Sequence, residues 1–515
     1  MDDEDAHLLS NLLKGSGLVF LGMLLEVSIA FAGKLVVARI FGPVEYGVIS
    51  VGTTLLTFSG IVLVLGLNSG IGRYVPRYDD ASRIRGVLVS GFQIAIPLSL
   101  AAALVLFVLS PRLADIIGAD GTTVRVLRLF SAAIPFAVFI RMVNGSMQGF
   151  KLPVPRTVLQ NVSLPVVRII GIAVVVALGF DSASVAWAYL VSYLVTAFLG
   201  LWFLHSRTPI FNWSVQYTPV RRTLLTFSAP LVVTAAMSAV FSDIDIFLLG
   251  ALAGAGPVGE YNAVYPLAQF LTMTVSAFGF LFVPVISELH ADGDHDALRR
   301  LIRTITKWAL LANLPLTLLL SLFPETIVSI TFGPKYVAAA PVLPILAVGF
   351  FVHTAAALSG NTLTSIGKTR LIMYDNFLVA VLNVVVNVAL IPDFGAFGAA
   401  LATTASYLTL GVLYIYQIWN KIDVNPISMG LFKPAVVATI VAGLVYLPVV
   451  ATLQRSAFSL VVACVLYAPL FIIVVLRTGG IEAEEARLVL MFEERFGIDL
   501  GPFKTLANKL INEEF

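Results

Sequence analysis

The sequence predicts an all-α integral membrane protein with about 14 transmembrane helices. We expect two parallel six-helix lobes around a central cavity, followed by two further helices. The first observation is composition: 58% of the residues are hydrophobic and 12% charged, with a mean hydropathy of +0.95, whereas soluble domains have roughly 25% charged residues. The second is a series of long, continuously apolar runs, which excludes the alternating pattern of a membrane β-barrel. The third is an internal repeat.

The apolar runs account for the predicted transmembrane helices. A span needs about 20 apolar residues to cross the hydrocarbon core. Runs of about this length lie at residues 17–41, 47–67, 86–110, 127–149, 157–179, 184–205, 224–250, 260–287, 301–323, 337–360, 371–391, 397–420, 431–451 and 458–476.

A short motif occurs twice, each time just after an apolar run. Gly42-Pro43-Val44-Glu45-Tyr46 returns as Gly256-Pro257-Val258-Gly259-Glu260-Tyr261, 256 − 42 = 214 residues later. Further echoes follow in the same order at offsets between 212 and 218, such as Ser192-Tyr193 and Ser406-Tyr407. Ordered self-similarity indicates a duplicated half. Two halves of a membrane protein imply a cleft about which they can rock, which is the layout of a transporter.

Basic residues are distributed unequally between the two sides of the predicted spans. Of the 32 Lys and Arg residues, 23 fall on one side and six on the other, and Lys34, Arg141 and Arg168 lie within spans. Because basic loops favour the cytoplasm, both termini are predicted to be cytoplasmic, in a plasma or inner membrane. With six spans in each half, both halves enter from the same side, so the repeat is parallel.

The repeat and the loops divide the chain into five parts. The loop between the sixth and seventh spans carries Pro209 and Pro219 and is the expected lobe linker. Glu and Arg residues flank an apolar stripe in the tail, which predicts an amphipathic helix at the membrane surface. The expected parts are an N-terminal lobe over 1–205, a cytoplasmic linker over 206–223, a C-terminal lobe over 224–420, helices 13 and 14 within 421–477, and a cytoplasmic tail over 478–515.

Ionisable residues within the spans are the strongest chemical signal, because such residues are costly at membrane depth and usually face a bundle interior or an aqueous cavity. The first half contributes Glu26, Lys34, Arg141 and Arg168 and is mainly basic. We interpret Lys34, Arg141 and Arg168 as a cationic wall that binds an anionic head group, since arginine can donate two parallel hydrogen bonds to phosphate. The alternative is that these cations pair with carboxylates or extend to the membrane interface.

The second half contributes mainly acidic groups, Asp243 and Asp245 in the seventh span and Asp375 in the eleventh. Asp243 and Asp245 lie about 200° apart on a regular helix, so one is a candidate coupling-cation site and the other a candidate helix–helix hydrogen bond. Glu26 is a third candidate for ion coupling. Polar side chains that share one face of the eleventh span are candidates for lining the cavity, with interhelical hydrogen bonding as the favoured alternative: Asn376, Asn383 and Asn387. His353 is expected to be a hydrogen-bonded core residue rather than a proton relay.

Two motifs resemble those of nucleotide-binding enzymes but lack the required context. The glycine pattern at residues 254–259 joins two membrane helices and follows no strand, unlike a dinucleotide site. Gly367-Lys368-Thr369 resembles the end of a phosphate-binding loop, but Thr362 occupies the position of its first glycine. We therefore expect no ATP hydrolysis, no enzyme activity, no cofactor and no metal site.

Several short motifs are distributed from about residue 15 to residue 475, and each of them alone is short. The motifs are Ala38-Arg39-Ile40-Phe41-Gly42-Pro43-Val44-Glu45-Tyr46-Gly47, Arg73-Tyr74-Val75-Pro76-Arg77-Tyr78, Asp245 with Gly250, Gly259-Glu260-Tyr261, Pro284 with Ser287, Phe332-Gly333 with Tyr336, Asn383 with Asn387, and Gly395-Ala396-Phe397-Gly398-Ala399-Ala400. As a set, these motifs resemble the polysaccharide flippases of the multidrug/oligosaccharidyl-lipid/polysaccharide exporter superfamily.

This resemblance implies a flippase that moves a polyprenyl-phosphate-linked or polyprenyl-diphosphate-linked oligosaccharide from the inner to the outer leaflet by alternating access. It would serve cell-surface polysaccharide or glycoprotein glycan assembly, with the lipid-linked glycan, membrane lipids and a coupling H⁺ or Na⁺ as partners, no nucleic acid, and a functional monomer. The motif glycines and tyrosines are expected to pack helices rather than to bind substrate.

Two other functions are open at this point. A multidrug/cation antiporter of the same superfamily would prefer an acidic cavity, which Lys34, Arg141 and Arg168 disfavour. A membrane glycosyltransferase or glycan polymerase would need a large external loop with catalytic acids, whereas the longest predicted external loop runs only from about Pro111 to Val126.

Overall fold

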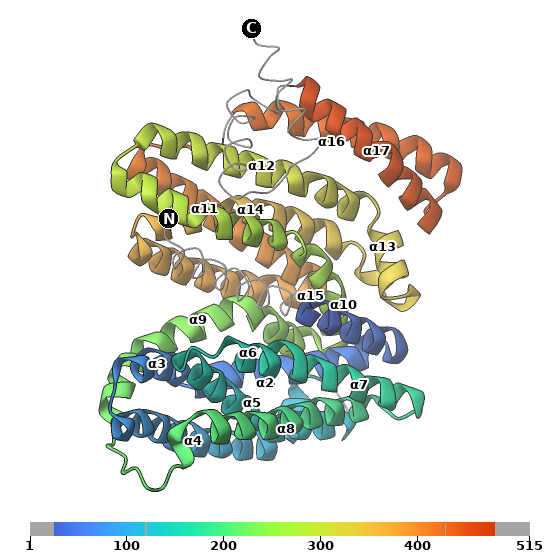
Figure 1. Ribbon diagram of the computed structural model, residues 1–515. Helices are drawn as coiled ribbons and strands as arrows, with labels where there is room; N and C mark the ends of the chain where they lie inside the picture. The colour runs from blue at the N-terminus through green and yellow to red at the C-terminus, as the bar shows by residue number, and fades with distance from the viewer. Residues whose placement is uncertain (1–24, 119–120, 428, 479–515) are drawn as a thin grey trace. The chain divides into compact units, whose positions relative to one another are not determined.

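The elements of the protein are helical throughout the part that the structure describes. The computed structural model describes residues 25–118, 121–427 and 429–478, and within these ranges the elements are α-helices with short 3₁₀ and π-helical segments (Figure 1). The all-α prediction is therefore confirmed. The amphipathic helix predicted in the tail lies outside the described residues.

The chain divides into two compact units, each built from several segments. The first comprises Met1–Ala263, Thr331–Ala339 and Asn383–Ala399, and the second comprises Val264–Ile330, Ala340–Leu382 and Ala400–Phe515. These bounds differ from those of the predicted lobes, because the linker and the seventh span both fall in the first unit. The division into two six-helix lobes remains a prediction.

The helices follow one another with short connections. The first described helix covers residues 25–41. The others, in order, are α2 (Pro43–Leu63), α3 (Leu67–Tyr74), η1 (Val75–Arg77), α4 (Ala81–Ile116), α5 (Gly121–Gly149), α6 (Pro153–Thr157), η2 (Val158–Ser163), α7 (Leu164–Ala177), α8 (Ser182–Arg207), η3 (Pro209–Phe211), α9 (Arg221–Ala253), α10 (Ala255–Gln269), α11 (Thr272–Asp292), α12 (His295–Leu322), α13 (Pro324–Thr331), η4 (Pro334–Ala339), α14 (Val342–Ser365), α15 (Thr369–Ile422), α16 (Met429–Leu453) and α17 (Ala457–Arg477).

Ten helical segments in the described ranges are long and apolar enough to cross a membrane, which makes this a multi-pass membrane protein. They are α2, α4, α5, the continuous segment from α6 to α7, α8, α12, α14, α15, α16 and α17. The predicted number of 14 spans is not confirmed by this count.

Helix α15 corresponds to two of the predicted spans. Its 54 residues would extend about 80 Å as one straight helix, far more than the roughly 30 Å of a hydrocarbon core. Gly395 interrupts it with non-helical angles, φ 53° and ψ −129°. Glycine adopts such angles readily because it has no Cβ. The break at Gly395 lies between the predicted spans at 371–391 and 397–420.

The predicted span at 260–287 is wrong as a single helix. The structure breaks it at Phe270 and Leu271, between α10 and α11. Pro266 lies inside α10 and removes one backbone donor near its end. The hydropathy of the segment is continuous across the break, so the sequence pattern did not reveal it.

The two copies of the repeated motif pack against each other. A Cβ on Gly47 in α2 would lie 1.8 Å from the carbonyl oxygen of Ala255 in α10, and a Cβ on Gly259 would lie 1.9 Å from that of Pro43. The backbones of the two helices are thus in direct contact, as small residues allow in membranes. This supports the expectation that the motif glycines pack helices.

The predicted lobe linker is held against the N-terminal end of α4. Arg85 is buried; its Nε donates to the carbonyl oxygen of Ile210 at 3.2 Å, and its Nη1 donates to that of Val215. A Cβ on Gly86 would lie 1.9 Å from the carbonyl oxygen of Thr218. Residues 208–220 therefore form a fixed strap on the first unit.

Candidate functional site

Glu26 is held by an amide from a widened helical turn. The Nδ2 group of Asn161 donates a hydrogen bond to Oε2 of Glu26, and Asn161 is buried in the π-helical segment η2. Pro165 follows two residues after η2 and has no N–H to donate to the Asn161 carbonyl, which favours a widened turn there. The π-helix thus directs a polar side chain toward the first described helix.

Arg168 in α7 packs on two aromatic rings of α8. Its guanidinium carbon lies 4.3 Å from the ring centroid of Tyr189 and 5.7 Å from that of Tyr193. Its Nε has no hydrogen-bond partner among the described residues, although Glu26 and Lys34 are close enough to interact with it electrostatically. Stacking positions the planar cation and leaves N–H groups available.

Arg141 in α5 approaches Tyr193 as well. The two side chains interact electrostatically, and Nε of Arg141 lies 3.2 Å from the place where a Cβ of Gly60 would be. Gly60 in α2 therefore makes room for the guanidinium. Tyr193 is the common neighbour of the two predicted substrate-binding arginines.

Lys34 is the third predicted cation. It is solvent-accessible and interacts electrostatically with Asp243 in α9 and with Arg168. Within the described part of the chain, Lys34 forms no hydrogen bond and no ion pair within 4 Å. Lys34, Arg168, Glu26 and Asp243 thus belong to one cluster of alternating charge in the first unit.

Asp245 has a different environment from Asp243. It is buried and accepts hydrogen bonds from the Tyr261 hydroxyl at 3.1 Å and from Nδ2 of Asn387 at 2.6 Å. The same Nδ2 of Asn387 lies 3.0 Å from Oδ1 of Asn383. The network joins α9, α10 and α15, so Asp245 is the interhelical hydrogen-bonding member of the acidic pair.

The remaining predicted polar residues lie in the second unit. Asn376 accepts a hydrogen bond from the Tyr414 hydroxyl at 3.1 Å, and Asp375 accepts one from Nε2 of Gln417 at 2.6 Å. His353 stacks on Tyr407 with ring centroids 4.2 Å apart. Asn376 shares a helix face with Asn383 and Asn387 but has a different partner and belongs to a different unit.

Four site residues were not identified from the sequence: Asn161, Tyr189, Tyr193 and Tyr261. Ionisable residues are conspicuous at membrane depth because they are costly there, whereas a tyrosine in an apolar span is not. The four-residue spacing of Tyr189 and Tyr193, which places both on one helix face, was the available signal.

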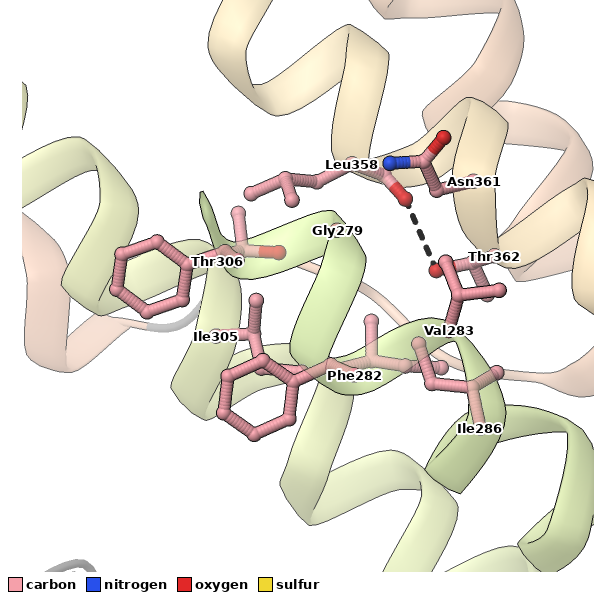
Figure 2. A pocket seen from close by; sticks show the side chains of 11 residues that line it. Gly279, Phe282, Val283, Ile286, Ile305, Thr306, Leu358, Asn361 and Thr362 are labelled. Carbon is pink, nitrogen blue, oxygen red and sulfur yellow. Dashed lines mark hydrogen bonds between the residues drawn. The ribbon is translucent and has the colours of Figure 1, made fainter. Parts of the chain in front are cut away.

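A small cavity lies between α11, α12 and α14 in the second unit (Figure 2). Gly279 lines it, and the side chains of Thr306 and Asn361 bring polar atoms to it. Its volume is about 10 Å³, roughly the minimum for one water molecule. It cannot hold an oligosaccharide or a drug.

Two protein-family models match long parts of the chain. The family model described as "Polysaccharide biosynthesis protein" matches residues 36–341, and that of "Lipid II flippase MurJ" matches residues 244–468. The chain belongs to the polysaccharide biosynthesis protein family. This match covers more than half of the sequence and includes Arg168 and Asp243 of the charge cluster, whereas Glu26 and Lys34 precede it.

Curated relatives of this protein have low sequence identity to it but align with most of its length. An uncharacterized membrane protein of Methanocaldococcus jannaschii is 26% identical over 80% of this chain and 84% of its own length. The probable low-salt glycan biosynthesis flippase Agl15 of Haloferax volcanii is 22% identical over 81% of this chain and 85% of its own length.

Solved structures share the fold of this family member. The lipid II flippase MurJ in an inward closed conformation matches with a TM-score of 0.68 at 13% identity, covering 89% of this chain and 98% of that one. A multidrug resistance MATE family transporter of the MOP superfamily, inward-facing, matches at 0.66 and 16% identity, covering 77% and 94%. The chain thus shares its fold with a flippase and with a drug transporter.

Proposed function

We propose that this protein is a flippase that moves a polyprenyl-(di)phosphate-linked oligosaccharide from the inner to the outer leaflet of the cytoplasmic membrane. The names of its relatives, a glycan biosynthesis flippase and a lipid II flippase, describe transport rather than catalysis. Alternating access between the two halves supplies the route, and both termini are cytoplasmic. The functional unit is a monomer.

The observation that carries the proposal is the state of the three intramembrane cations. Lys34, Arg141 and Arg168 form no hydrogen bond and no ion pair within 4 Å in the described part of the chain. Arg141 and Arg168 are half-buried and Lys34 is exposed, and a cation at membrane depth without a bonded carboxylate favours an external anion. Phosphate meets this requirement, and the rings of Tyr189 and Tyr193 offer flat surfaces beside it.

Ion coupling is assigned to Asp243, with Glu26 as a second group. Asp245 is saturated by Tyr261 and Asn387, whereas Asp243 faces Lys34 electrostatically without a hydrogen bond in the described residues. A proton or Na⁺ at Asp243 would weaken its attraction for Lys34 and free that cation for the substrate.

The alternative is a multidrug/cation antiporter, which the fold alone does not exclude. The charges favour the flippase, since three intramembrane cations repel a cationic drug. A membrane glycosyltransferase is less favoured, because the named relatives are transport proteins.

The test is a flipping assay in proteoliposomes with a fluorescent polyprenyl-diphosphate disaccharide, in which dithionite quenches only the outer-leaflet label. Arg168→Ala should slow flipping by at least about tenfold, the loss expected for a charge-assisted hydrogen bond. Arg207→Ala is the matched control, since Arg207 is exposed in the last turn of α8. Both variants should have wild-type thermal stability.

Normal flipping by Arg168→Ala would contradict the role of the cations. Flipping absent from the wild-type protein, together with export of an ethidium-like cation, would establish the antiporter instead. In cells, deletion of the gene should trap lipid-linked glycan in the inner leaflet, and the lipid that co-purifies should carry a phosphate. Asp243→Asn should abolish the stimulation of flipping by a Na⁺ or proton gradient and leave downhill flipping measurable.

A further inference from the structure

An apolar groove runs along α4, α5 and α8 in the first unit. Its volume is about 790 Å³, and every residue that lines it is apolar. Several of the lining side chains are exposed, among them Leu104 at 65% and Phe198 at 69%. The side chains that form most of its walls are Leu100, Leu104, Phe107, Phe136, Phe198 and Leu201.

The groove has the length of one leaflet. Its α4 wall runs from Ile96 to Phe107, and the 107 − 96 = 11 helical rises between them correspond to about 16 Å along the helix axis. Half of a hydrocarbon core is about 15 Å. These residues occupy the half of the predicted span at 86–110 that is farther from the cytoplasm. A single hydrocarbon chain fits this shape.

One end of the groove carries an arginine. The guanidinium carbon of Arg128 in α5 lies 5.1 Å from the ring centroid of Phe107, the last α4 residue of the lining. Arg128 is exposed, and within the described residues it has no hydrogen bond and no ion pair. Arg125 nearby differs, because its Nη1 is paired with Oδ2 of Asp181 at 3.3 Å.

Arg128 also lies on the side of the membrane where basic residues are rare in the predicted orientation. Only six of the 32 Lys and Arg residues fall there, as the positive-inside tendency requires. Exposed Arg112 and Asp115 at the end of α4 balance one another in charge. Arg128 is thus a cation at the rim of an apolar groove, and no residue in the described part of the chain accepts a hydrogen bond from its guanidinium.

We propose that this groove binds one acyl chain of an anionic phospholipid of the outer leaflet, with the lipid phosphate on Arg128. Arginine suits phosphate through paired hydrogen bonds, and the groove supplies apolar contact along one leaflet depth. The occupant is a resident membrane lipid rather than the transported one. On α5, Phe136 and Phe139 lie about 140° and 200° around the helix from Arg141, so the groove and the candidate substrate site use opposite faces of that helix.

The first test is native mass spectrometry of the full chain in detergent, titrated with dioleoyl phosphatidylglycerol or dioleoyl phosphatidylcholine. Arg128→Gln should weaken phosphatidylglycerol binding about fivefold, a typical loss for one exposed charged contact. It should weaken phosphatidylcholine binding less, because the choline cation of that lipid offsets the charge of its phosphate. Arg125→Gln is the control, since its guanidinium is engaged by Asp181, and it should change neither. Equal affinity for the two lipids in the wild type, or no effect of Arg128→Gln, would overturn the proposal.

The second test locates the acyl chain of the lipid and does not depend on Arg128. Leu100→Trp places a fluorophore in the groove, and Val465→Trp places one on the exposed face of α17, where Val465 is 66% exposed. Phosphatidylglycerol brominated on its acyl chains, present at a low mole fraction, should quench the tryptophan at position 100 at least twofold more than that at 465. Equal quenching would reject a specific site. Weaker quenching at 100 together with a dimeric mass would identify the groove as an interface between two copies and would equally reject the lipid.

Discussion

The contact between the two motif copies leads to a sharp prediction for Gly47→Ala. The added Cβ would lie 1.8 Å from the carbonyl oxygen of Ala255, 2.8 Å from the carbonyl carbon and 3.0 Å from the nitrogen of Gly259. Ordinary contact begins at 3.4 Å, so the helices must separate by about 3.4 − 1.8 = 1.6 Å. Because the obstacle is backbone, no side-chain rotation can relieve it.

Two opposing terms set the size of the effect. Alanine improves helix propensity over glycine by about 1 kcal/mol, whereas overpacking costs about 1–3 kcal/mol and more where backbone must move. We therefore expect a net loss of about 2 kcal/mol. Gly443→Ala in α16 is the matched control, since nothing lies within 4 Å of its Cβ, and it should be neutral or stabilising.

The measurement is unfolding of the purified protein in mixed micelles, followed by helical circular dichroism. Gly259→Ala should match Gly47→Ala, because its Cβ meets the Pro43 carbonyl at 1.9 Å. The double variant should lose less than the sum, since one separation of the helices relieves both clashes. If Gly47→Ala is as stable as Gly443→Ala, the direct backbone contact is not present.

Three further outcomes are expected. Arg85→Ala removes both hydrogen bonds to the strap over residues 208–220, so chymotrypsin should cut there faster. Arg83→Ala should leave the cleavage rate unchanged, because the Arg83 guanidinium lies over the Tyr78 ring and, among the described residues, forms no hydrogen bond with the strap. Asn387→Ala removes a donor from buried Asp245 and should destabilise the protein by about 1–3 kcal/mol in the same micelle assay; a change below about 0.5 kcal/mol would contradict the network. Gly279→Ala brings a Cβ to 2.7 Å from Nδ2 of Asn361, a side chain that can turn, so its midpoint should differ from that of the wild type far less than that of Gly47→Ala does.

The intramembrane charges were predictable as a set but not in their pairing. The sequence identified Glu26, Lys34, Arg168 and Asp243 because any ionisable residue at membrane depth is conspicuous. It assigned Asp243 to a second, acidic lobe, whereas the structure places it in the same compact unit as the cations. The predicted lobes were drawn from the internal repeat and from a proline-containing loop, and neither specifies which helices pack together in one compact unit.

The burial of Arg85 is a second feature that the sequence did not predict. In the sequence it is one of several basic residues beside a cytoplasmic loop, and such residues are usually exposed. The structure buries it beneath the strap, because the carbonyls of Ile210 and Val215 accept its donors. Its role depends on a distant loop, since Ile210 lies 125 residues away from Arg85 in the sequence.

The sequence by itself determined the properties that the bilayer imposes on each segment separately. An apolar run long enough to cross, the side on which its basic flanks lie and the cost of a buried charge are local properties, so the class of protein and its candidate residues followed from them. Only the tertiary structure decided which residues meet. Asn161 reaches Glu26 across 135 positions and Asn387 reaches Asp245 across 142, and such contacts depend on how helices pack, through glycines and bent turns whose partners no local pattern specifies.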